Sequence, residues 1–213
     1  MTHNITKDQY LHDPCGTCAT AFWKNSYFKK PNDVQIVHER DLPANIDNFR
    51  IERYFRLLHN LISIEPRNLP DNFYFQTVNI NSQLGTVAHL INRCYDDICV
   101  TPQQVEKWTK YKVFDNNLWI FIYEMSSSYP VALGIADFDC DIGEGSLEWI
   151  QALPEKRGKG LGQALVAELL LRLAVIADFV TVSGKTDSET NPEMLYRKCG
   201  FKGEDIWCVL ASK

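Results

Sequence analysis

The sequence lacks the features that define several protein classes. A membrane-spanning helix needs roughly 20 mostly apolar residues, and the most apolar stretch, 161–182, is interrupted by four polar side chains. These four are Gln163, Glu168, Arg172 and Asp178. The first residues also lack the apolar middle of a signal peptide. Basic residues are not in excess, since the formal net charge is −5, whereas nucleic-acid binding needs a cationic surface. We therefore expect neither a membrane nor a nucleic-acid partner.

The sequence also has no internal repeat and no low-complexity run. Its seven cysteines are an odd number in a chain without an export signal, which predicts reduced thiols and a cytoplasmic location. At 45% hydrophobic and 23% charged residues, the composition is typical of a globular protein with a sizeable core. A chain of 213 residues allows one large domain, or one domain with an extension.

The first 70 residues differ in pattern from the rest of the chain. They hold five of the nine prolines. The segment 33–40 alternates like a strand, while the periodicity of 49–64 fits a strand or a helix equally. We predict that residues 1–70 form a folded N-terminal extension, packed on a core domain at 71–213. A dimer contact is one role open to this extension.

The pattern from residue 71 onward predicts alternating strands and helices. This order indicates an α/β protein with a mixed sheet flanked by helices. In the predicted helix at 101–111, Thr101 is the N-cap and Pro102 the first helical residue. We expect strands at 72–80, 117–125, 129–139, 146–153, 179–184 and, as one or two strands, 200–212; and helices at 84–98, 101–111, 161–176 and 191–199.

A basic, glycine-rich turn precedes the helix predicted at 161–176. Gly158, Gly160 and Gly162 alternate with other residues here, and Arg157 and Lys159 add positive charge. The first N–H groups of a helix have no internal partner, and glycine lets an anion approach them closely. The turn therefore suits a diphosphate, although a solvated basic loop that caps a core helix would have the same composition.

Two common phosphate-binding motifs do not fit this turn. The nucleotide-triphosphate loop needs Ser or Thr after Gly-Lys, but Gly160 follows Lys159. The Gly-Lys-Thr at 184–186 is preceded by Phe179 where the motif needs its first glycine. The dinucleotide pattern Gly-x-Gly-x-x-Gly fails in both possible frames, and it usually lies in the first strand–helix unit of its fold.

The residues around the turn resemble the acetyl-CoA signature of the GNAT (GCN5-related) N-acetyltransferase superfamily. The sequence "IQALPEKRGKGLGQALV" at 150–166 contains its Gln/Arg-x-x-Gly-x-Gly/Ala pattern, filled by Arg157, Gly160 and Gly162. The sequence "NPEMLYRKCGF" at 191–201 resembles the family's Asn…Leu-Tyr-x-Lys-x-Gly-Phe ending. The resemblance covers roughly residues 71–213.

This resemblance implies a fold, a reaction and a set of contacts. The fold would be an acyl-CoA N-acyltransferase fold, whose mixed sheet is splayed between the strand ending at Ala152 and the strand at 178–183. The reaction would move an acetyl group from acetyl-CoA to a primary amine by direct attack in a ternary complex, without a metal. The acceptor would be a small-molecule or peptide amine. The implied cofactor-binding residues are Ile150, Gln151 and Ala152 for pantetheine; Arg157, Gly158, Lys159, Gly160, Leu161, Gly162 and Gln163 for pyrophosphate; and Asn191 near the thiol.

Two residues are candidates for the proton transfers of this reaction. Tyr196 would protonate the departing thiolate, and its alternative is an aromatic packed in a short helix. Glu148 would take the proton of the amine. Strand alternation predicts that it shares a face with Ile150 and Ala152; its alternatives are a surface position or a charge that holds a cationic substrate. Asp139 and Asp141 are weaker candidates for the base.

Other residues leave alternatives open. Cys15 and Cys18 form a CxxC with His12 nearby, which gives three of the four ligands that tetrahedral zinc takes, or a turn with two packed thiols. Asn191 also fits an N-cap. Cys199 is most simply a packed thiol, and three tryptophans, Trp108, Trp119 and Trp149, fit core packing or a substrate platform. A catalytically silent acyl-CoA-binding module is the alternative function.

Overall fold

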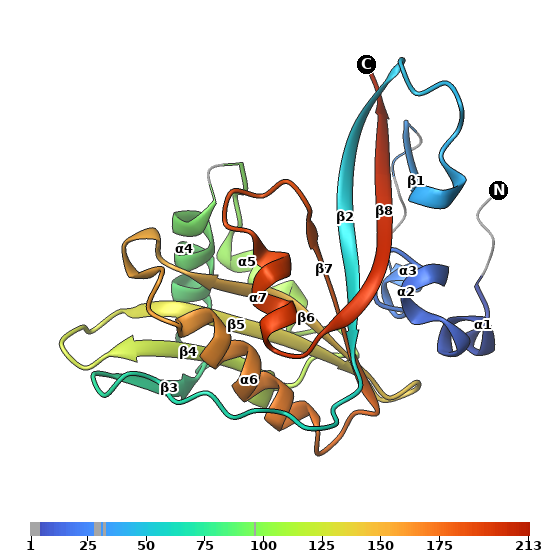
Figure 1. The fold of residues 1–213 in the computed structure, drawn as a ribbon. Coiled ribbons are helices and arrows are strands. Elements are labelled where there is room, and N and C mark those ends of the chain that lie inside the picture. Colours follow the sequence, from blue (N-terminus) through green and yellow to red (C-terminus); the bar gives the residue numbers. More distant parts are fainter. Residues whose placement is uncertain (1–4, 28–30, 32, 96) are drawn as a thin grey trace. The chain divides into compact units, whose positions relative to one another are not determined.

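A computed structural model describes residues 5–27, 31, 33–95 and 97–213. The chain divides into two compact units. The terminal unit combines Met1–Asn60 with Phe179–Lys213, and the central unit is the continuous segment Leu61–Asp178. Figure 1 shows the elements that build them.

The central unit contains an antiparallel sheet in the order β6-β5-β4-β3. Its strands are β3 (Phe73–Thr77), β4 (Trp119–Glu124), β5 (Pro130–Asp139) and β6 (Glu144–Ala152), and its helical elements are α4 (Leu84–Cys94), α5 (Pro102–Trp108), η2 (Asn116–Leu118), η3 (Pro154–Lys156) and α6 (Leu161–Leu173).

Helices cover both faces of this sheet. On one face, a Cβ added to Gly134 of β5 would lie 3.1 Å from side-chain atoms of Leu165 and Leu169 of α6, so glycine allows a close helix–sheet approach. On the other face, Trp149 of β6 stacks on Trp108 of α5. The core of this unit therefore lies on both sides of β5, whose residues are almost all buried.

Local sequence signals explain where two of the central helices begin. Thr101 caps α5 through a reciprocal capping box with Gln104, and Pro102 occupies the first helical position. Helix α6 begins after Gly160 and buries eight of its thirteen residues. It ends at Leu173, three residues earlier than predicted.

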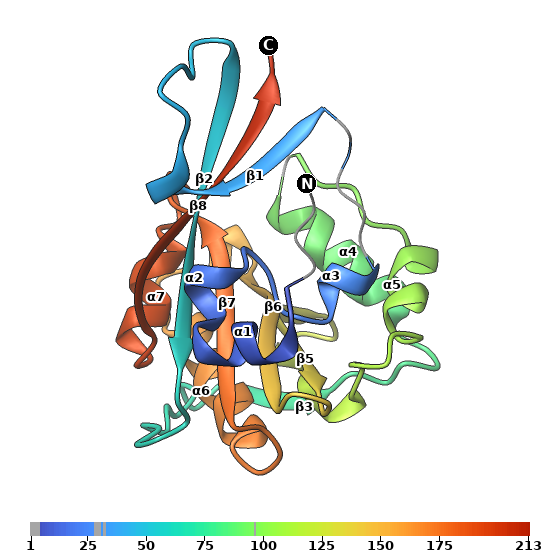
Figure 2. The same cartoon turned by 90° about the vertical axis from the view of Figure 1, so that its right-hand side faces the viewer.

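The terminal unit is built from both ends of the chain. Its antiparallel strand order is β1-β8-β2-β7, with bounds β1 (Val34–His38), β2 (Phe49–His59), β7 (Phe179–Lys185) and β8 (Lys202–Ser212). Its helical elements are α1 (Lys7–His12), α2 (Pro14–Thr17), α3 (Lys24–Tyr27), η1 (Glu39–Asp41) and α7 (Pro192–Lys198). Figure 2 shows α1 and α2 beside β2, and α2 contacts β2 and β8.

The ambiguous segment at 49–64 is a strand, β2, and it lies between β8 and β7. Its side chain Arg56 is 2% exposed and donates hydrogen bonds to the hydroxyls of Tyr10, Thr181 and Ser183. This guanidinium therefore joins α1, β2 and β7. The division at residue 70 into an extension and a core domain stays a prediction.

Candidate cofactor turn and active-site residues

The predicted glycine turn forms the start of α6. Gly158 and Gly160 have φ angles of 77° and 79°, in the left-handed region that favours glycine. A Cβ at either position would meet no atom within 4 Å, so the turn is open on that side. Gly160 is the N-cap, and no side chain caps the helix there. The turn thus presents the N-terminal end of a 13-residue helix to an incoming group.

Neighbouring elements hold this turn in place. The guanidinium of Arg157 donates to the carbonyl of Ala152 through Nε and to that of Cys94 through Nη2, each at 3.3 Å. Arg93 of α4 pairs with Glu155 at 2.7 Å. Because these bonds tie the residues before Gly158 to the end of α4, the helix fixes the path of the turn. No sequence pattern indicated that Arg93 pairs with Glu155, because the two residues are 62 positions apart.

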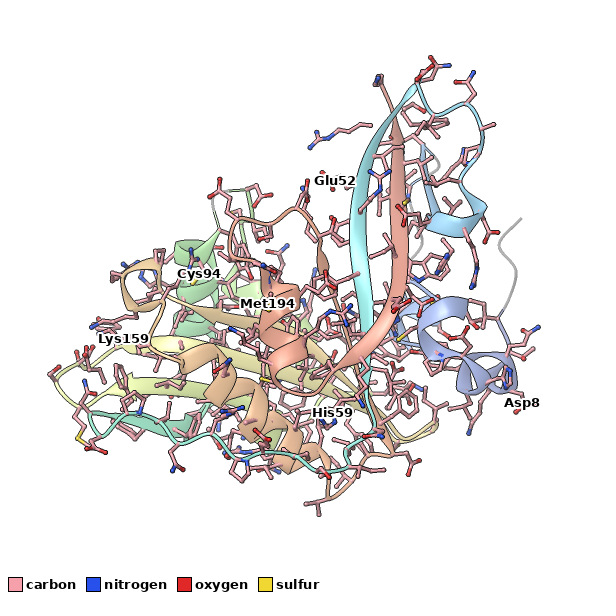
Figure 3. The ribbon with its side chains drawn as sticks, viewed as in Figure 1. Asp8, Glu52, His59, Cys94, Lys159 and Met194 are labelled. Carbon is pink, nitrogen blue, oxygen red and sulfur yellow. The ribbon has the colours of Figure 1, made fainter. Side chains whose placement is uncertain are left out.

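Lysines on either side of Arg157 lie toward the edge of the sheet. Lys156 pairs with Glu124 at the end of β4, and its ammonium holds the pKa of that carboxyl below the usual range. Lys159, labelled in Figure 3, lies 5.8 Å from the centroid of the Phe73 ring. Of the remaining turn residues, Leu161 is buried, whereas Gly162 and Gln163 are half-buried.

The predicted pantetheine-binding residues lie on β6. Ile150, Gln151 and Ala152 pair with Gly134, Leu133 and Ala132 of β5. Gln151 is 6% exposed, and within the described part of the chain neither polar atom of its side-chain amide has a hydrogen-bond partner. Leaving a buried amide without hydrogen bonds costs free energy. The side-chain oxygen and nitrogen of Gln151 would therefore gain from hydrogen bonds to a bound polar group.

The environment of Glu148 differs from the sequence prediction. The β5–β6 register shifts here, because Ala136 lies opposite Leu147 but Ile135 lies opposite Trp149. Glu148 is thus the extra residue of a β-bulge, which breaks alternation. The Ser146 hydroxyl donates to its carboxylate at 3.0 Å. The prediction that Glu148 shares a face with Ile150 and Ala152 is wrong, because the bulge leaves Glu148 on the face of Ser146.

The two alternative carboxylates belong to the β5–β6 hairpin. Lys112 donates to Asp141 at 2.7 Å and lies 3.4 Å from Asp139. Asp139 is 2% exposed and accepts the N–H of Asp141. Both carboxylates therefore hold the hairpin to Lys112, and their role as a base stays a prediction.

Tyr196 and Asn191 lie in the terminal unit, whereas all the other predicted site residues lie in the central unit. The ring of Tyr196 is buried between Phe55 and Phe201, with centroid distances of 6.0 and 5.7 Å. Asn191 is the N-cap of α7, and its side-chain oxygen accepts the N–H of Met194 at 3.3 Å. The predicted N-cap is confirmed; the cofactor and acid roles of these two residues stay predictions.

The cysteines of the CxxC motif are both buried. Cys18 contacts Asn25 at 3.3 Å, and the carbonyl of Cys15 accepts the indole N–H of Trp207. These contacts favour the second interpretation of the motif, a turn with two packed thiols. Within the described ranges, no group of three or more metal-ligating side chains was found.

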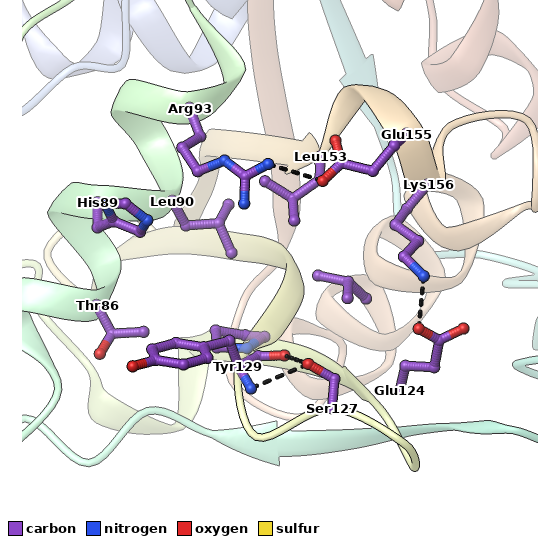
Figure 4. A pocket seen from close by; sticks show the side chains of 12 residues that line it. Thr86, His89, Leu90, Arg93, Glu124, Ser127, Tyr129, Leu153, Glu155 and Lys156 are labelled. Atoms are coloured by element: carbon purple, nitrogen blue, oxygen red, sulfur yellow. Dashed lines mark hydrogen bonds and ion pairs between the residues drawn. The ribbon is translucent and has the colours of Figure 1, made fainter.

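A cavity of about 440 Å³ lies in the central unit between α4 and the β4–β5 hairpin, as Figure 4 shows. Leu90, Val131 and Leu153 give it an apolar lining, and the Arg93–Glu155 and Lys156–Glu124 pairs lie around it. The sequence did not predict this cavity, because its walls come from three separated segments. The remaining lining residues are Thr86, His89, Ser127, Tyr129 and Pro130.

Comparisons with known proteins agree with this geometry. Residues 116–203 match the model of the acetyltransferase (GNAT) domain family. That range contains the glycine turn, the bulge at Glu148 and Tyr196. No curated protein matches the sequence. Among the described helices, none has both the length and the apolar character to cross a membrane.

Solved structures with the same fold have very different sequences. A GCN5-related N-acetyltransferase from Sphaerobacter thermophilus has a TM-score of 0.67 at 17% identity, over 76% of this chain and 52% of that chain. An acetyltransferase of the GNAT family from Colwellia psychrerythraea has a TM-score of 0.60 at 14% identity, over 84% and 64%. A GCN5-related N-acetyltransferase from Kribbella flavida has a TM-score of 0.57 at 14% identity, over 84% and 67%.

The chain spans about half the length of the first of these structures. At such low identity the likeness shows the fold alone, and the predicted α/β acyl-CoA N-acyltransferase fold class is thereby confirmed. Residues 116–203 are thus similar to the acetyltransferase (GNAT) domain family, and the chain has the fold of solved GCN5-related N-acetyltransferases.

Proposed function

We propose that this protein transfers an acetyl group from acetyl-CoA to a primary amine by direct attack in a ternary complex. The observation that carries the proposal is the open turn at Gly158–Gly160, where two left-handed glycines lead into α6. A diphosphate fits such a turn because backbone N–H groups and the helix dipole both favour an anion there. The family match over 116–203 supports acetyl-CoA as the donor.

Glu148 is our candidate for the general base. An alkylamine is mostly protonated at pH 7, so it must lose a proton before its nitrogen can attack. A carboxylate that is oriented by the Ser146 hydroxyl can accept that proton, directly or through a water molecule. We assign stabilisation of the oxyanion to a backbone N–H of β6, because a bulge leaves a peptide group outside the regular ladder.

Tyr196 is our candidate for the general acid. The amine nitrogen forms a bond to the acetyl carbon, and the C–S bond then breaks with its electron pair on sulfur. The Tyr196 hydroxyl would protonate this thiolate, so that free CoA leaves as the thiol. Phe55 and Phe201 fix the plane of the Tyr196 ring, which limits the directions its hydroxyl can take.

Thiol release with a panel of amines tests the reaction. We expect Glu148→Gln and Tyr196→Phe each to lower kcat by roughly a hundredfold or more, while CoA affinity by calorimetry stays unchanged. Asp141→Asn is the matched control, because it removes a carboxylate held by Lys112 and should leave turnover intact.

The same assay separates this function from its alternative. Saturable CoA binding without turnover on any amine would favour a catalytically silent acyl-CoA-binding module. If calorimetry detects no CoA binding at all, the assignment of the turn fails together with both functions.

A further inference from the structure

Three half-buried aromatic side chains of the central unit form a continuous group, here called the aromatic wall: Tyr95, Trp108 and Trp149. The rings of Trp108 and Trp149 stack with centroids 5.6 Å apart and planes 21° apart. Tyr95 meets Trp149 edge to face at 6.0 Å. The wall thus joins the end of α4, the end of α5 and the middle of β6.

The bulge brings this wall and the candidate base together. In a regular strand, Glu148 and Trp149 would point to opposite faces. Here Trp149 lies opposite Ile135 and Ser146 lies opposite Asp137, so Trp149 and Ser146 share a face. Since Ser146 also hydrogen-bonds Glu148, two consecutive residues present a carboxylate and an indole on the same side of the sheet.

Trp119 differs from the wall in its exposure to solvent. Trp119 lies in the same cluster, 6.5 Å from Trp108, but it is 1% exposed. Trp108 and Trp149 each keep part of their surface in contact with solvent. A partly exposed indole beside a carboxylate is the combination that attracts an organic cation, through the ring quadrupole and the negative charge together.

We propose that the aromatic wall is the acceptor-recognition surface, and that it selects a primary amine carried on a flat aromatic or apolar body. The body packs on Trp108 and Trp149, and the ammonium group lies toward Glu148. This inference rests on the proposed acetyl transfer and names the acceptor class for it. A small hydrophilic amine gains little from the wall, and an anionic amine is repelled by Glu148.

The test uses 2-phenylethylamine as the probe and 2-phenylethanol as its uncharged counterpart. We expect 2-phenylethylamine to be acetylated with a kcat/KM at least tenfold above that of methylamine. Trp149→Leu and Trp108→Leu should each raise the KM for 2-phenylethylamine roughly tenfold and leave the KM for acetyl-CoA unchanged. Tyr74→Leu is the matched control: Tyr74 stacks on Tyr123 at 5.5 Å but belongs to the exposed edge strand β3.

Equilibrium binding keeps the test decisive without turnover. Isothermal titration calorimetry of the CoA-saturated protein should detect binding of 2-phenylethylamine, with weaker binding of 2-phenylethanol and loss of binding in Trp149→Leu. Thermal unfolding identifies variants that lose binding only because they lose the fold.

Two outcomes distinguish the inference from the proposed function. If other amines are acetylated but 2-phenylethylamine is no better than methylamine, or the Trp variants match Tyr74→Leu, the inference is overturned and the function stands. If 2-phenylethylamine binds in a Trp149-dependent manner but no amine is acetylated, the recognition surface stands and the transferase function fails.

Discussion

The two units of this protein are assembled from the sequence in opposite ways. The central unit is one continuous segment, Leu61–Asp178, in which neighbouring strands of the sheet are successive in the chain. The terminal unit combines the first 60 residues with the last 35, and β2 pairs on both sides with strands from the other end of the chain. The central unit therefore forms through local contacts, whereas the terminal unit needs loop closure across more than 100 residues.

This difference bears on where each unit can be disturbed. The central unit holds the glycine turn and Glu148, and its most sensitive features are backbone conformations. The terminal unit holds Tyr196 and depends on long-range contacts such as the hydrogen bonds of Arg56. The three predictions below test this contrast.

The largest effect is expected in the terminal unit. Arg56→Ala removes a buried guanidinium from three hydroxyl groups and should lower the free energy of unfolding by about 3 kcal/mol. Arg53→Ala, three residues earlier on β2, removes only an exposed pair with Glu39 and should cost less than about 0.5 kcal/mol. Denaturant unfolding measures both. Equal losses would show that Arg56 is not the long-range tie that we describe.

Two glycine-to-alanine substitutions in the central unit should change the free energy of unfolding by smaller amounts and in opposite directions. Gly160→Ala forces a Cβ into the left-handed region and should cost about 1–2 kcal/mol, with weaker CoA binding. Gly85→Ala lies inside α4, where a Cβ meets nothing within 4 Å, and should add about 0.5–1 kcal/mol. Unfolding curves and calorimetry give the two values. A stabilising Gly160→Ala would contradict the geometry of the turn.

The smallest effect is a pH dependence in the terminal unit. Burial, and secondarily the nearby charge of Lys202, lower the pKa of His59 below 6.5. The unfolded chain therefore binds a proton more readily than the folded protein does. The contribution of His59 to the free energy of unfolding should be constant above pH 6.5. It should fall as the pH drops from 6.5 through the pKa of His59 in the folded protein. His59→Phe should flatten this part of the stability curve between pH 8 and 5; an unchanged slope would assign it to other groups.

Much of the central unit could be predicted from local patterns. The capping box at Thr101 and Pro102 located the start of α5, and the run of glycines located the start of α6. Both signals work because helix ends need specific partners for their unpaired groups. Local patterns could not show whether 49–64 is a strand or a helix. The segment forms a strand because it pairs with β7 and β8, which are remote in the sequence.

The candidate site shows the same limit. The residue types of the turn were visible in the sequence, but the bulge at Glu148 was not, since a register shift is a property of two paired strands. Strand alternation therefore predicted the wrong face for this carboxylate. The hydroxyl that orients it, on Ser146, and the stacking of Trp108 on Trp149 likewise depend on that register.

The amino-acid sequence alone was enough to predict the turn at 157–162 and the helix after it. Glycine conformations and helix caps are set by neighbours a few residues away. Three-dimensional packing placed β2 between β8 and β7, buried Arg56 against residues more than 40 positions distant, and put Glu148 on the face of Ser146. The physical reason is that register and burial are fixed by partners remote in sequence, whose contacts repay the entropy of closing long loops only in the folded chain.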